Sequence, residues 1–469
     1  MVVMKFGGAS LSDLKNFLNV VSFIQDHAQE QKGITVVVSA MKDVTQRLID
    51  ASTEAEHRNF SVSDEHLDWI YNQHKEVLEG IKEGEDKEAA ESILREALEE
   101  LRSLCHAVGA LQECTPRAKD LILSFGERLS SCFLSALLRQ AGVDAVQIPG
   151  EGLIVTDEQF GSAYPLEEST NNNVQKVLKP LFKKETIPVV AGFTGATQSG
   201  QTTTLGRGGT DFTASILGAS LGAQAVWFMK EVDGIMSADP QTVHTARTIE
   251  VMSYQEVAEL SFFGAKVLHP VAIHPLKQKK ISAYIKNVYK HTFQGTLVEH
   301  SPDNHKQGPK AVTAISDVSM ISVEGDGMIG IPGVAGRAFM SIAKHGVNIL
   351  MISQTCSEQN ICLAVKKEDQ AGTLRALSQE FELEILQGRI DRVMARDDVA
   401  IISLVGAGMS GVPGIAGKLF WLVGENQINV LMIAQGSSEV NISFLLESKD
   451  VKQGMRCIHD GFELGALND

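Results

Sequence analysis

The sequence predicts an α/β protein, in which a mainly parallel sheet covered by helices is followed by two copies of a smaller antiparallel module. Three observations support this fold class. Up to about residue 295, short apolar runs rich in β-branched residues alternate with segments of helical periodicity. Residues 321–365 are then repeated at 402–446, at an offset of 81 (402 − 321). The length of 469 residues also suits about three domains.

The first predicted element is a βαβ unit. Val2 to Phe6 and Ile34 to Ser39 are continuous apolar runs, as expected of strands buried on both faces of a parallel sheet. Between them, Ser12 is placed to cap a helix whose apolar residues recur at helical spacing. Further strands are predicted at 144–148, 187–193, 225–229 and 281–285. Residues 61–107, rich in Glu, Lys and Leu, predict a helical insertion with a solvated face.

The repeated segment begins after a polar stretch at 300–310 that resembles a linker. Each copy predicts strand, turn, helix, strand, tight turn, strand and helix. This βαββα(β) order is expected to give an antiparallel sheet with helices on one face. The two copies share glycines, a proline and amides at matching positions, among them Gly325/Gly406, Gly330/Gly411, Pro332/Pro413, Asn348/Asn429 and Gln354/Gln435.

The composition limits the classes of function. The chain has 42 Lys and Arg against 58 Asp and Glu, and its formal net charge of −16 repels nucleic acid and anionic membranes. An anionic ligand therefore needs cations concentrated locally. The six cysteines form no CxxC pair, which predicts free thiols in a reducing compartment. With no charged leader and no run near the roughly 20 apolar residues of a membrane span, we expect a cytoplasmic protein.

Three glycine-rich segments resemble nucleotide-binding motifs incompletely. Gly325 to Gly330 and Gly406 to Gly411 each read G-x-G-x-x-G. The strands that follow end at Gln354 and Gln435, where a dinucleotide site needs an acidic residue for the ribose. A nicotinamide-dependent dehydrogenase is therefore an alternative that rests on these turns alone. Gly195 to Thr202 has P-loop spacing without its lysine, so we expect a mobile polar loop instead of a Walker site.

A lysine and two glycines mark the end of the first strand. The segment Lys5 to Ser10 brings the lysine to a glycine turn just before a helix. Glycines let backbone N–H groups approach a phosphate, the helix start adds its positive end, and the lysine adds a compact charge. An ordinary tight turn has the same composition, so the residues alone leave both interpretations open.

A second charged turn lies at Gly206 to Asp211, ahead of a helix at Phe212 to Leu221. Arg207 suits bidentate capture of a carboxylate, and Asp211 can bind an amine or assist a metal. The alternative is that Thr210 or Asp211 merely caps the helix. We favour a binding site, because capping needs neither an arginine nor three glycines.

Two further segments carry charge in apolar surroundings. Gly126 precedes Glu127 inside a helical segment that begins near Pro116, and a glycine there suggests close approach of another group. Lys266 is a lone lysine at a helix start, and such a lysine is costly to bury unpaired.

The segments, and the order in which they follow one another along the chain, resemble those of the aspartate kinases (aspartokinases) of the amino acid kinase family. The matching motifs are K-F-G-G-x-S at Lys5, V-V-S-A at Val37, G-E-R-L-S at Gly126, G-F-x-G at Gly192, T-T-L-G-R-G-G-[ST]-D at Thr203, D-G-I-x-x-A-D-P at Asp233 and F-G-A-K-V-L-H-P at Phe263. The repeats resemble tandem ACT domains, in the version found in aspartokinases fused to homoserine dehydrogenase. The resemblance implies a three-layer helix-sheet-helix kinase domain at 1–295, a linker at 296–317 that can add an ACT strand, and ferredoxin-like (βαββαβ) ACT domains at 318–396 and 397–469.

The resemblance also implies an activity, the transfer of the γ-phosphoryl group of ATP, with Mg²⁺, to the side-chain carboxylate of L-aspartate. The product, 4-phospho-L-aspartate, begins lysine, threonine and methionine biosynthesis. By resemblance, Lys5 and Asp211 are catalytic, Arg207 holds the α-carboxylate of aspartate, and no residue is a dedicated metal ligand. The implied aspartate site is Ser39, Thr45, Glu127, Phe193, Arg207, Thr210 and Asp211. The implied ATP site is Lys5, Gly7, Gly8, Ser10, Lys230, Glu231, Met236, Lys266 and Val267, with Lys230, Glu231 and Met236 near the adenosine.

ACT domains of this family bind free amino acids between paired modules, so the resemblance implies feedback regulation and a homodimer or higher homo-oligomer. The implied effector residues are Met328, Asn348, Ile349, Gln354, Asn429 and Gln435. Their uncharged amides favour threonine over lysine as the effector. Four residues depart from the family pattern on the nucleotide side: Ala9, Glu231, Met236 and Gln241. These departures leave a catalytically decayed amino-acid sensor as a second alternative.

Overall fold

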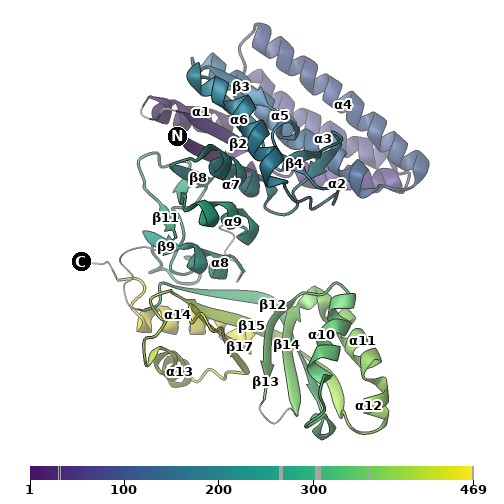
Figure 1. The fold of residues 1–469 in the computed structure, drawn as a ribbon, viewed down its shortest axis with the longest axis vertical. Helices are drawn as coiled ribbons and strands as arrows, with labels where there is room; N and C mark the ends of the chain where they lie inside the picture. The colour runs from purple at the N-terminus through teal and green to yellow at the C-terminus, as the bar shows by residue number, and fades with distance from the viewer. Residues whose placement is uncertain (30, 32, 263–267, 301–307, 356–358, 467–469) are drawn as a thin grey trace. The chain divides into compact units, whose positions relative to one another are not determined.

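The computed structural model describes residues 1–29, 31, 33–262, 268–300, 308–355 and 359–466, which form two compact units (Figure 1). The N-terminal unit comprises Met1–Ile235, Glu250–Ala258 and Lys266–Pro302. The C-terminal unit comprises Met236–Ile249, Glu259–Ala265 and Asp303–Asp469. Each unit is built around its own sheet.

The N-terminal unit contains an eight-stranded sheet in the order β3-β5-β2-β1-β8-β10-β11-β9. Its strands are β1 (Val2–Phe6), β2 (Ile34–Val38), β3 (Ala145–Ile148), β5 (Ile187–Ala191), β8 (Ala225–Lys230), β9 (Val251–Ser253), β10 (Ser282–Asn287) and β11 (Thr296–Glu299). Every pairing is parallel except that of β10 with β11, which confirms the predicted mainly parallel sheet. The apolar runs of β1, β2 and β5 are buried along their whole length, as expected of central parallel strands.

Helices pack on both faces of this sheet, giving the predicted three layers (Figure 1). The helices are α1 (Leu14–Ala28), α2 (Val44–Glu56), α3 (Phe60–Glu79), α4 (Glu85–Leu111), α5 (Pro116–Gln140), α6 (Glu167–Lys183), α7 (Gly209–Leu221), α8 (Tyr254–Phe262) and α9 (Pro270–Lys279). Met4 and Phe6 belong to the core that α1 and α5 complete. Because side chains alternate along a strand, Lys5 points to the opposite face, where α7 packs on β1, β2 and β8.

The N-terminal ends of α1 and α5 are each fixed by a capping side chain. The predicted cap of α1 at Ser12 is wrong by one residue, because the Asp13 side chain accepts from the backbone N–H of Asn16 at 2.9 Å. Ser12 instead donates to Asp13 at 2.8 Å. Helix α5 begins with a Thr115 cap and a proline at its first turn.

The predicted helical insertion is formed by α3 and α4, which pack on α2 and on α5. Helix α5 is long and apolar enough to cross a membrane by length and composition alone, contrary to the expectation from the sequence. In the structure, 89% of its apolar window is buried. It is thus the central core helix of the N-terminal unit.

The segment with P-loop spacing forms a β-hairpin, so the predicted mobile loop is wrong. Strands β6 (Thr194–Thr197) and β7 (Thr202–Thr204) are joined by a turn at Gly200, whose φ of +81° suits glycine. Together with β4 (Val155–Thr156) they form a small sheet. In a P-loop a helix follows the glycine-rich turn directly, whereas here the strand β7 follows it.

The C-terminal unit contains a six-stranded antiparallel sheet in the order β13-β14-β12-β15-β17-β16. Its strands are β12 (Ala311–Glu324), β13 (Ile349–Gln354), β14 (Asn360–Lys366), β15 (Arg392–Val405), β16 (Met432–Gln435) and β17 (Asn441–Glu447). Its helices are α10 (Val334–Lys344), α11 (Gln370–Glu380), α12 (Glu382–Leu386), α13 (Ile415–Glu425) and α14 (Val451–Gly461).

The two repeats share the long central strands of this sheet. The second half of β12 pairs with the first half of β15, which completes a βαββαβ module from the first repeat. The first half of β12, which precedes that repeat, pairs with the second half of β15 and completes the second module. The predicted pair of ferredoxin-like modules is thus confirmed, with β12 and β15 each contributing to both.

Candidate functional site

An open cavity of about 380 Å³ lies at the carboxyl ends of β1 and β2, where ligands bind in open α/β sheets. Its walls come from the turns after β1, β2 and β5, from α5, and from the first turn of α7. The lining residues are Lys5, Gly8, Ala9, Ser39, Ala40, Met41, Lys42, Asp43, Thr45, Glu127, Phe193, Gly208, Gly209, Thr210 and Asp211.

Two lysines share one buried carboxylate at this cavity. Lys5 Nζ lies 2.6 Å from Asp211 Oδ1, and Lys230 Nζ lies 3.5 Å from Asp211 Oδ2. Burial alone would raise the pKa of Asp211, but the charges of Lys5 and Lys230 hold it below its usual value. Burial and the neighbouring Lys5 lower the pKa of Lys230. The three groups carry a net charge of about +1, which suits an anionic ligand.

The fold brings these three residues together from distant parts of the chain. Lys5 lies near the end of β1, Lys230 is the last residue of the adjacent β8, and both point to the α7 face of the sheet. Asp211 lies in the first turn of α7, which packs on both strands. Gly208 caps this helix with a φ of +73°, a conformation that favours glycine.

Glu127 supplies a second acidic group with a different electrostatic character. Its side chain projects from the core helix α5 and is only 3% exposed. Burial raises its pKa to about 8, partly offset by a backbone hydrogen bond with Ala40. Its Oε2 atom is buried and has no hydrogen-bond partner in the part of the chain that the structure describes. A cationic group of a ligand would satisfy this oxygen.

Glycines allow the cavity walls to approach closely. A Cβ atom on Gly126 would lie 2.6 Å from the Cβ of Ala40, which explains the glycine that the sequence places inside α5. A Cβ on Gly8 would lie 2.8 Å from the carbonyl oxygen of Ala40. A Cβ on Gly209 would lie 2.7 Å from the Phe193 ring. The turns after β1, β2 and β5 therefore pack without space for side chains at these points.

The structure gathers most of the residues expected at the aspartate site. Six of the seven line the cavity: Ser39, Thr45, Glu127, Phe193, Thr210 and Asp211. Arg207 precedes the lining residue Gly208, is exposed, and makes no hydrogen bond or ion pair with other described residues.

The residues expected at the ATP site are less completely gathered. Lys5 and Gly8 line the cavity, a Cβ on Gly7 would lie 3.5 Å from Lys5 Nζ, and Ser10 donates to Glu231 at 2.6 Å. Met236 belongs to the C-terminal unit, where its backbone bridges to that of Thr248. Lys266 and Val267 lie outside the described residues.

Sequence reasoning missed two charged residues of the cavity. Lys42 and Asp43 line it from the turn after β2. Asp43 has a φ of +65° and directly precedes α2. Their position could have identified them, because they follow the strand that ends in V-V-S-A, and residues at the carboxyl ends of parallel strands face the ligand crevice.

The residues expected to bind an effector lie in the C-terminal unit. Gln435 lines a cavity of about 280 Å³ together with Met409 and Glu439. The carboxylate of Glu439 accepts from the backbone N–H of Gly411 at 2.6 Å. Asn429 lies three residues before β16 and Gln435 ends that strand.

The first module shows the same separation. Asn348 precedes β13 and is exposed, Ile349 begins the strand, and Gln354 ends it and is also exposed. Met328 is buried in a 3₁₀ turn between β12 and α10. Within one module the two amides thus lie at opposite ends of the strand.

Comparisons with known proteins match nearly the whole chain. A model of the amino acid kinase family matches residues 1–287, and an ACT domain model matches residues 321–381 and 402–462. The chain is 31% identical to bifunctional aspartokinase/homoserine dehydrogenase 1 of Zea mays, over 98% of this chain and 50% of that protein. It is 30% identical to aspartokinase 3 of Arabidopsis thaliana, over 98% of this chain and 81% of that protein. The chain thus spans about half the length of the bifunctional relatives.

Solved structures agree with these relatives. The crystal structure of E. coli aspartokinase III with aspartate and ADP matches with a TM-score of 0.80 at 26% identity, covering 99% of this chain and 100% of that chain. Aspartate kinase of Clostridium acetobutylicum matches with a TM-score of 0.81 at 25% identity, covering 98% of this chain and 100% of that chain. With its parallel sheet, its tandem ACT modules and these relatives, the chain belongs to the aspartokinases of the amino acid kinase family.

Proposed function

We propose that the chain is an aspartate kinase, which transfers the γ-phosphoryl group of ATP to the side-chain carboxylate of L-aspartate. The observation that carries this proposal is the Lys5–Asp211–Lys230 cluster, beside a cavity that also presents Glu127. Phosphoryl transfer depends on positioning and on cations where negative charge shifts. Further support comes from E. coli aspartokinase III, which was solved with aspartate and ADP.

The cavity residues have complementary roles in this reaction. Asp211 holds the ammonium of Lys5 in place, and that ammonium stabilises the phosphoryl group as it leaves ADP. The turn at Gly8 and the start of α7 direct backbone N–H groups toward the phosphates. Arg207 is unpaired among the described residues, so its guanidinium is free to form a two-pronged contact with the α-carboxylate of aspartate. A carboxylate oxygen of aspartate then attacks the γ-phosphorus and ADP departs.

Magnesium would enter bound to ATP. Among the described residues, no group of three or more His, Cys, Asp or Glu side chains lies close enough together to hold a metal ion. Mg²⁺ often keeps few protein ligands and coordinates phosphate oxygens instead. The ion would neutralise charge on the phosphates while Lys5 and Lys230 act on the same group.

The proposed activity is tested by trapping its product. The chain is incubated with ATP, magnesium, L-aspartate and hydroxylamine, and we expect aspartyl hydroxamate and ADP in equal amounts. A decayed sensor gives no hydroxamate, and neither does a dehydrogenase. Absence of hydroxamate from protein that binds ADP would overturn the proposal.

Glu127 generates a prediction about pH. Aspartate carries an ammonium group, and Glu127 binds it only after losing the proton that its pKa of about 8 retains at neutral pH. We therefore expect kcat/KM for aspartate to rise from pH 6 through pH 8 and to level off above about pH 9, since this parameter reports free-enzyme pKa values. Glu127→Gln should remove this rise and increase KM for aspartate about tenfold.

Thermal unfolding provides the control for Glu127→Gln. The folded state binds a proton at Glu127 that the unfolded chain releases near pH 4.5, so wild-type stability should fall as pH rises from 4.5 to 8. The glutamine variant lacks this loss and should unfold at no lower temperature than wild type at pH 8. An unchanged pH profile of kcat/KM in a folded variant would contradict the role of Glu127.

Lys230 should act on the phosphates, although the family resemblance places it near the adenosine. Lys230→Met should lower kcat about 100-fold, because one of two cations facing Asp211 is lost, while KM for aspartate changes less than twofold. The matched control is Lys286→Met on the neighbouring strand β10. Lys286 is also a buried lysine of the sheet, but it stacks on the Trp227 ring at 4.6 Å. Equal losses of kcat in the two variants would show that Lys230 only stabilises the fold, as any buried lysine of this sheet would, and would contradict its role at the phosphates.

Regulation through the ACT modules is part of the same proposal. Gln435 and Met409 line the C-terminal cavity with uncharged groups, and the one carboxylate there, Glu439, already accepts from the backbone N–H of Gly411, which supports threonine as effector over lysine. A structure of E. coli aspartokinase III contains lysine, so both amino acids are titrated against kinase activity. We expect threonine to inhibit and Gln435→Ala to weaken that inhibition. Inhibition by lysine alone would contradict this assignment.

Three further expectations belong to this proposal. The edge strands β13 and β16 expose Ile352 and Ile433, which supports a homodimer assembled through the ACT modules. The product would serve lysine, threonine and methionine biosynthesis. The plant relatives are chloroplastic, and we propose the cytoplasm for this chain.

A further inference from the structure

The connection between β8 and β9 folds as part of the C-terminal unit. Residues 236–249 lie inside the segment that the amino acid kinase family model matches, yet they pack with the ACT modules. The chain leaves the N-terminal unit after Ile235 and returns to it at Glu250. Lys230 and Glu231, which the proposed function places on the nucleotide side, lie five and four residues before Ile235.

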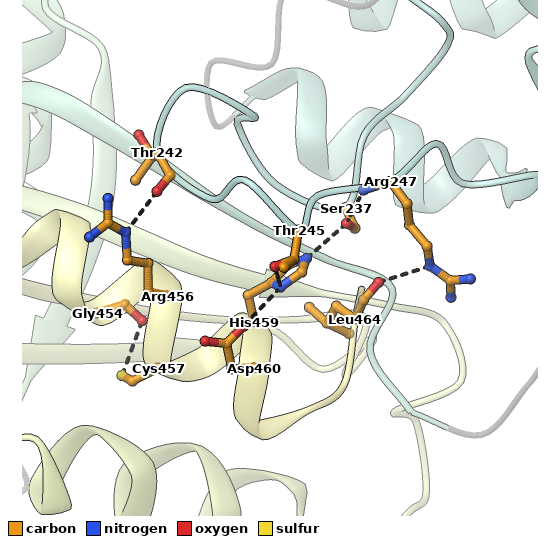
Figure 2. Close-up of polar contacts among 10 residues, drawn as sticks. All are labelled: Ser237, Thr242, Thr245, Arg247, Gly454, Arg456, Cys457, His459, Asp460 and Leu464. Atoms are coloured by element: carbon orange, nitrogen blue, oxygen red, sulfur yellow. Dashed lines mark hydrogen bonds and ion pairs between the residues drawn. The ribbon is translucent and has the colours of Figure 1, made fainter. Parts of the chain in front are cut away.

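A buried histidine of α14 holds the start of this connection (Figure 2). The His459 ring is completely buried, and its Nε2 lies 2.9 Å from Ser237 Oγ. Its Nδ1 lies 3.4 Å from Thr245 Oγ1 and 3.6 Å from a carboxylate oxygen of Asp460, which can only accept. The proton therefore belongs on Nδ1, and the Ser237 hydroxyl donates to Nε2. Ser237 Oγ in turn accepts from the backbone N–H of Arg247 at 3.0 Å.

Further contacts hold the rest of the connection against α14 and the residues after it (Figure 2). Arg456 Nε donates to the carbonyl oxygen of Thr242 at 2.9 Å. Arg247 Nε donates to the carbonyl oxygen of Leu464 at 2.9 Å. Residues 236–249 are thus held at their start, middle and end.

The connection also contributes to the core of the second ACT module. Ala238 and Val243 are buried in one apolar cluster with Ile402 of β15 and Ile458 of α14. Ser237 adds a backbone contact, because its carbonyl oxygen accepts from the N–H of Val312 in β12 at 2.8 Å. Removing the connection would therefore expose part of this core.

The residues just before the connection are fixed equally well in the N-terminal unit. Asp233 accepts from Asn287 at 2.7 Å and from Lys290 at 2.5 Å. The backbone N–H of Ile235 donates to Thr296 Oγ1 at 2.8 Å. Only Met236 separates this anchor from Ser237, so a single residue joins the two anchored positions of the chain.

We propose that His459 is a positioning residue, which through Ser237 couples the second ACT module to the nucleotide side of the phosphoryl-transfer site. This inference rests on the proposed function. A shift of α14 must either move Ser237 or break its bond to His459. Because one residue joins Ser237 to Ile235, a moved Ser237 strains the bond that anchors Ile235 and, through it, the stretch that begins at Lys230 and Glu231. ATP binding should respond, while aspartate binding should not.

The test compares variants of the contact with a variant elsewhere on α14. Ser237→Ala and His459→Leu remove the hydrogen bond, whereas His459→Gln keeps an oxygen that can accept from Ser237. Lys452→Ala on the exposed side of α14 is the matched control. We expect Ser237→Ala and His459→Leu to raise KM for ATP about 3- to 10-fold, with KM for aspartate within twofold of wild type. His459→Gln and Lys452→Ala should stay within twofold for both substrates.

A purely structural role gives a different pattern. A lower melting temperature with both KM values unchanged, or with both raised equally, would overturn the inference. If His459→Leu fails to fold, the smaller change Ser237→Ala decides the question alone. Calorimetric titration with ADP gives a second readout that does not need aspartate. Weaker ADP binding by Ser237→Ala supports the inference even where wild type makes no hydroxamate, and unchanged ADP binding contradicts it.

Discussion

The arrangement of the N-terminal unit depends on one interaction, the pairing of the Asp211 carboxylate with the ammonium groups of Lys5 and Lys230. A buried carboxylate or a buried lysine alone is strongly unfavourable, and each is stable here because the other faces it. This pairing requires β1 and β8 to be neighbours and α7 to begin directly above their ends. The sheet order and the helix start that satisfy these requirements also open the cavity beside them.

The cavity owes its shape to backbone contacts as much as to charge. The turns after β1 and β2 meet α5 at Gly8, Ala40 and Gly126, where a single added methyl group would overlap its neighbour. Such contacts keep Glu127 on a rigid, buried helix instead of a surface loop. The same burial raises the pKa of Glu127, whereas Asp211 on the opposite wall stays ionised beside its lysines. Two carboxylates in one cavity therefore have opposite protonation at neutral pH.

Much of this organisation follows from local sequence signals. Continuous apolar runs located the central strands, and the repeat at an offset of 81 located the two ACT modules. The motifs at Lys5, Gly126 and Thr210 meet in one cavity, although each was ambiguous alone.

Features that depend on distant contacts could not be read in this way. The helical spacing of α1 does not distinguish Ser12 from Asp13 as its cap, because both side chains can accept from the first turn. Residues 236–249 carry kinase motifs, yet Ala238 and Val243 complete an apolar cluster formed mostly by residues of the second ACT module. The spacing of apolar residues in the sequence predicts which side chains are buried, but it does not predict which of the two units they pack in.

The central claim, that Asp211 organises the two lysines for phosphoryl transfer, is tested most directly by the turnover of Asp211→Asn. Asparagine has nearly the same shape but no charge, so Lys5 and Lys230 lose their common partner and repel each other. With a folded variant, as judged by circular dichroism, we expect kcat to fall at least about 100-fold in the hydroxamate assay. A kcat within threefold of wild type would contradict the claim.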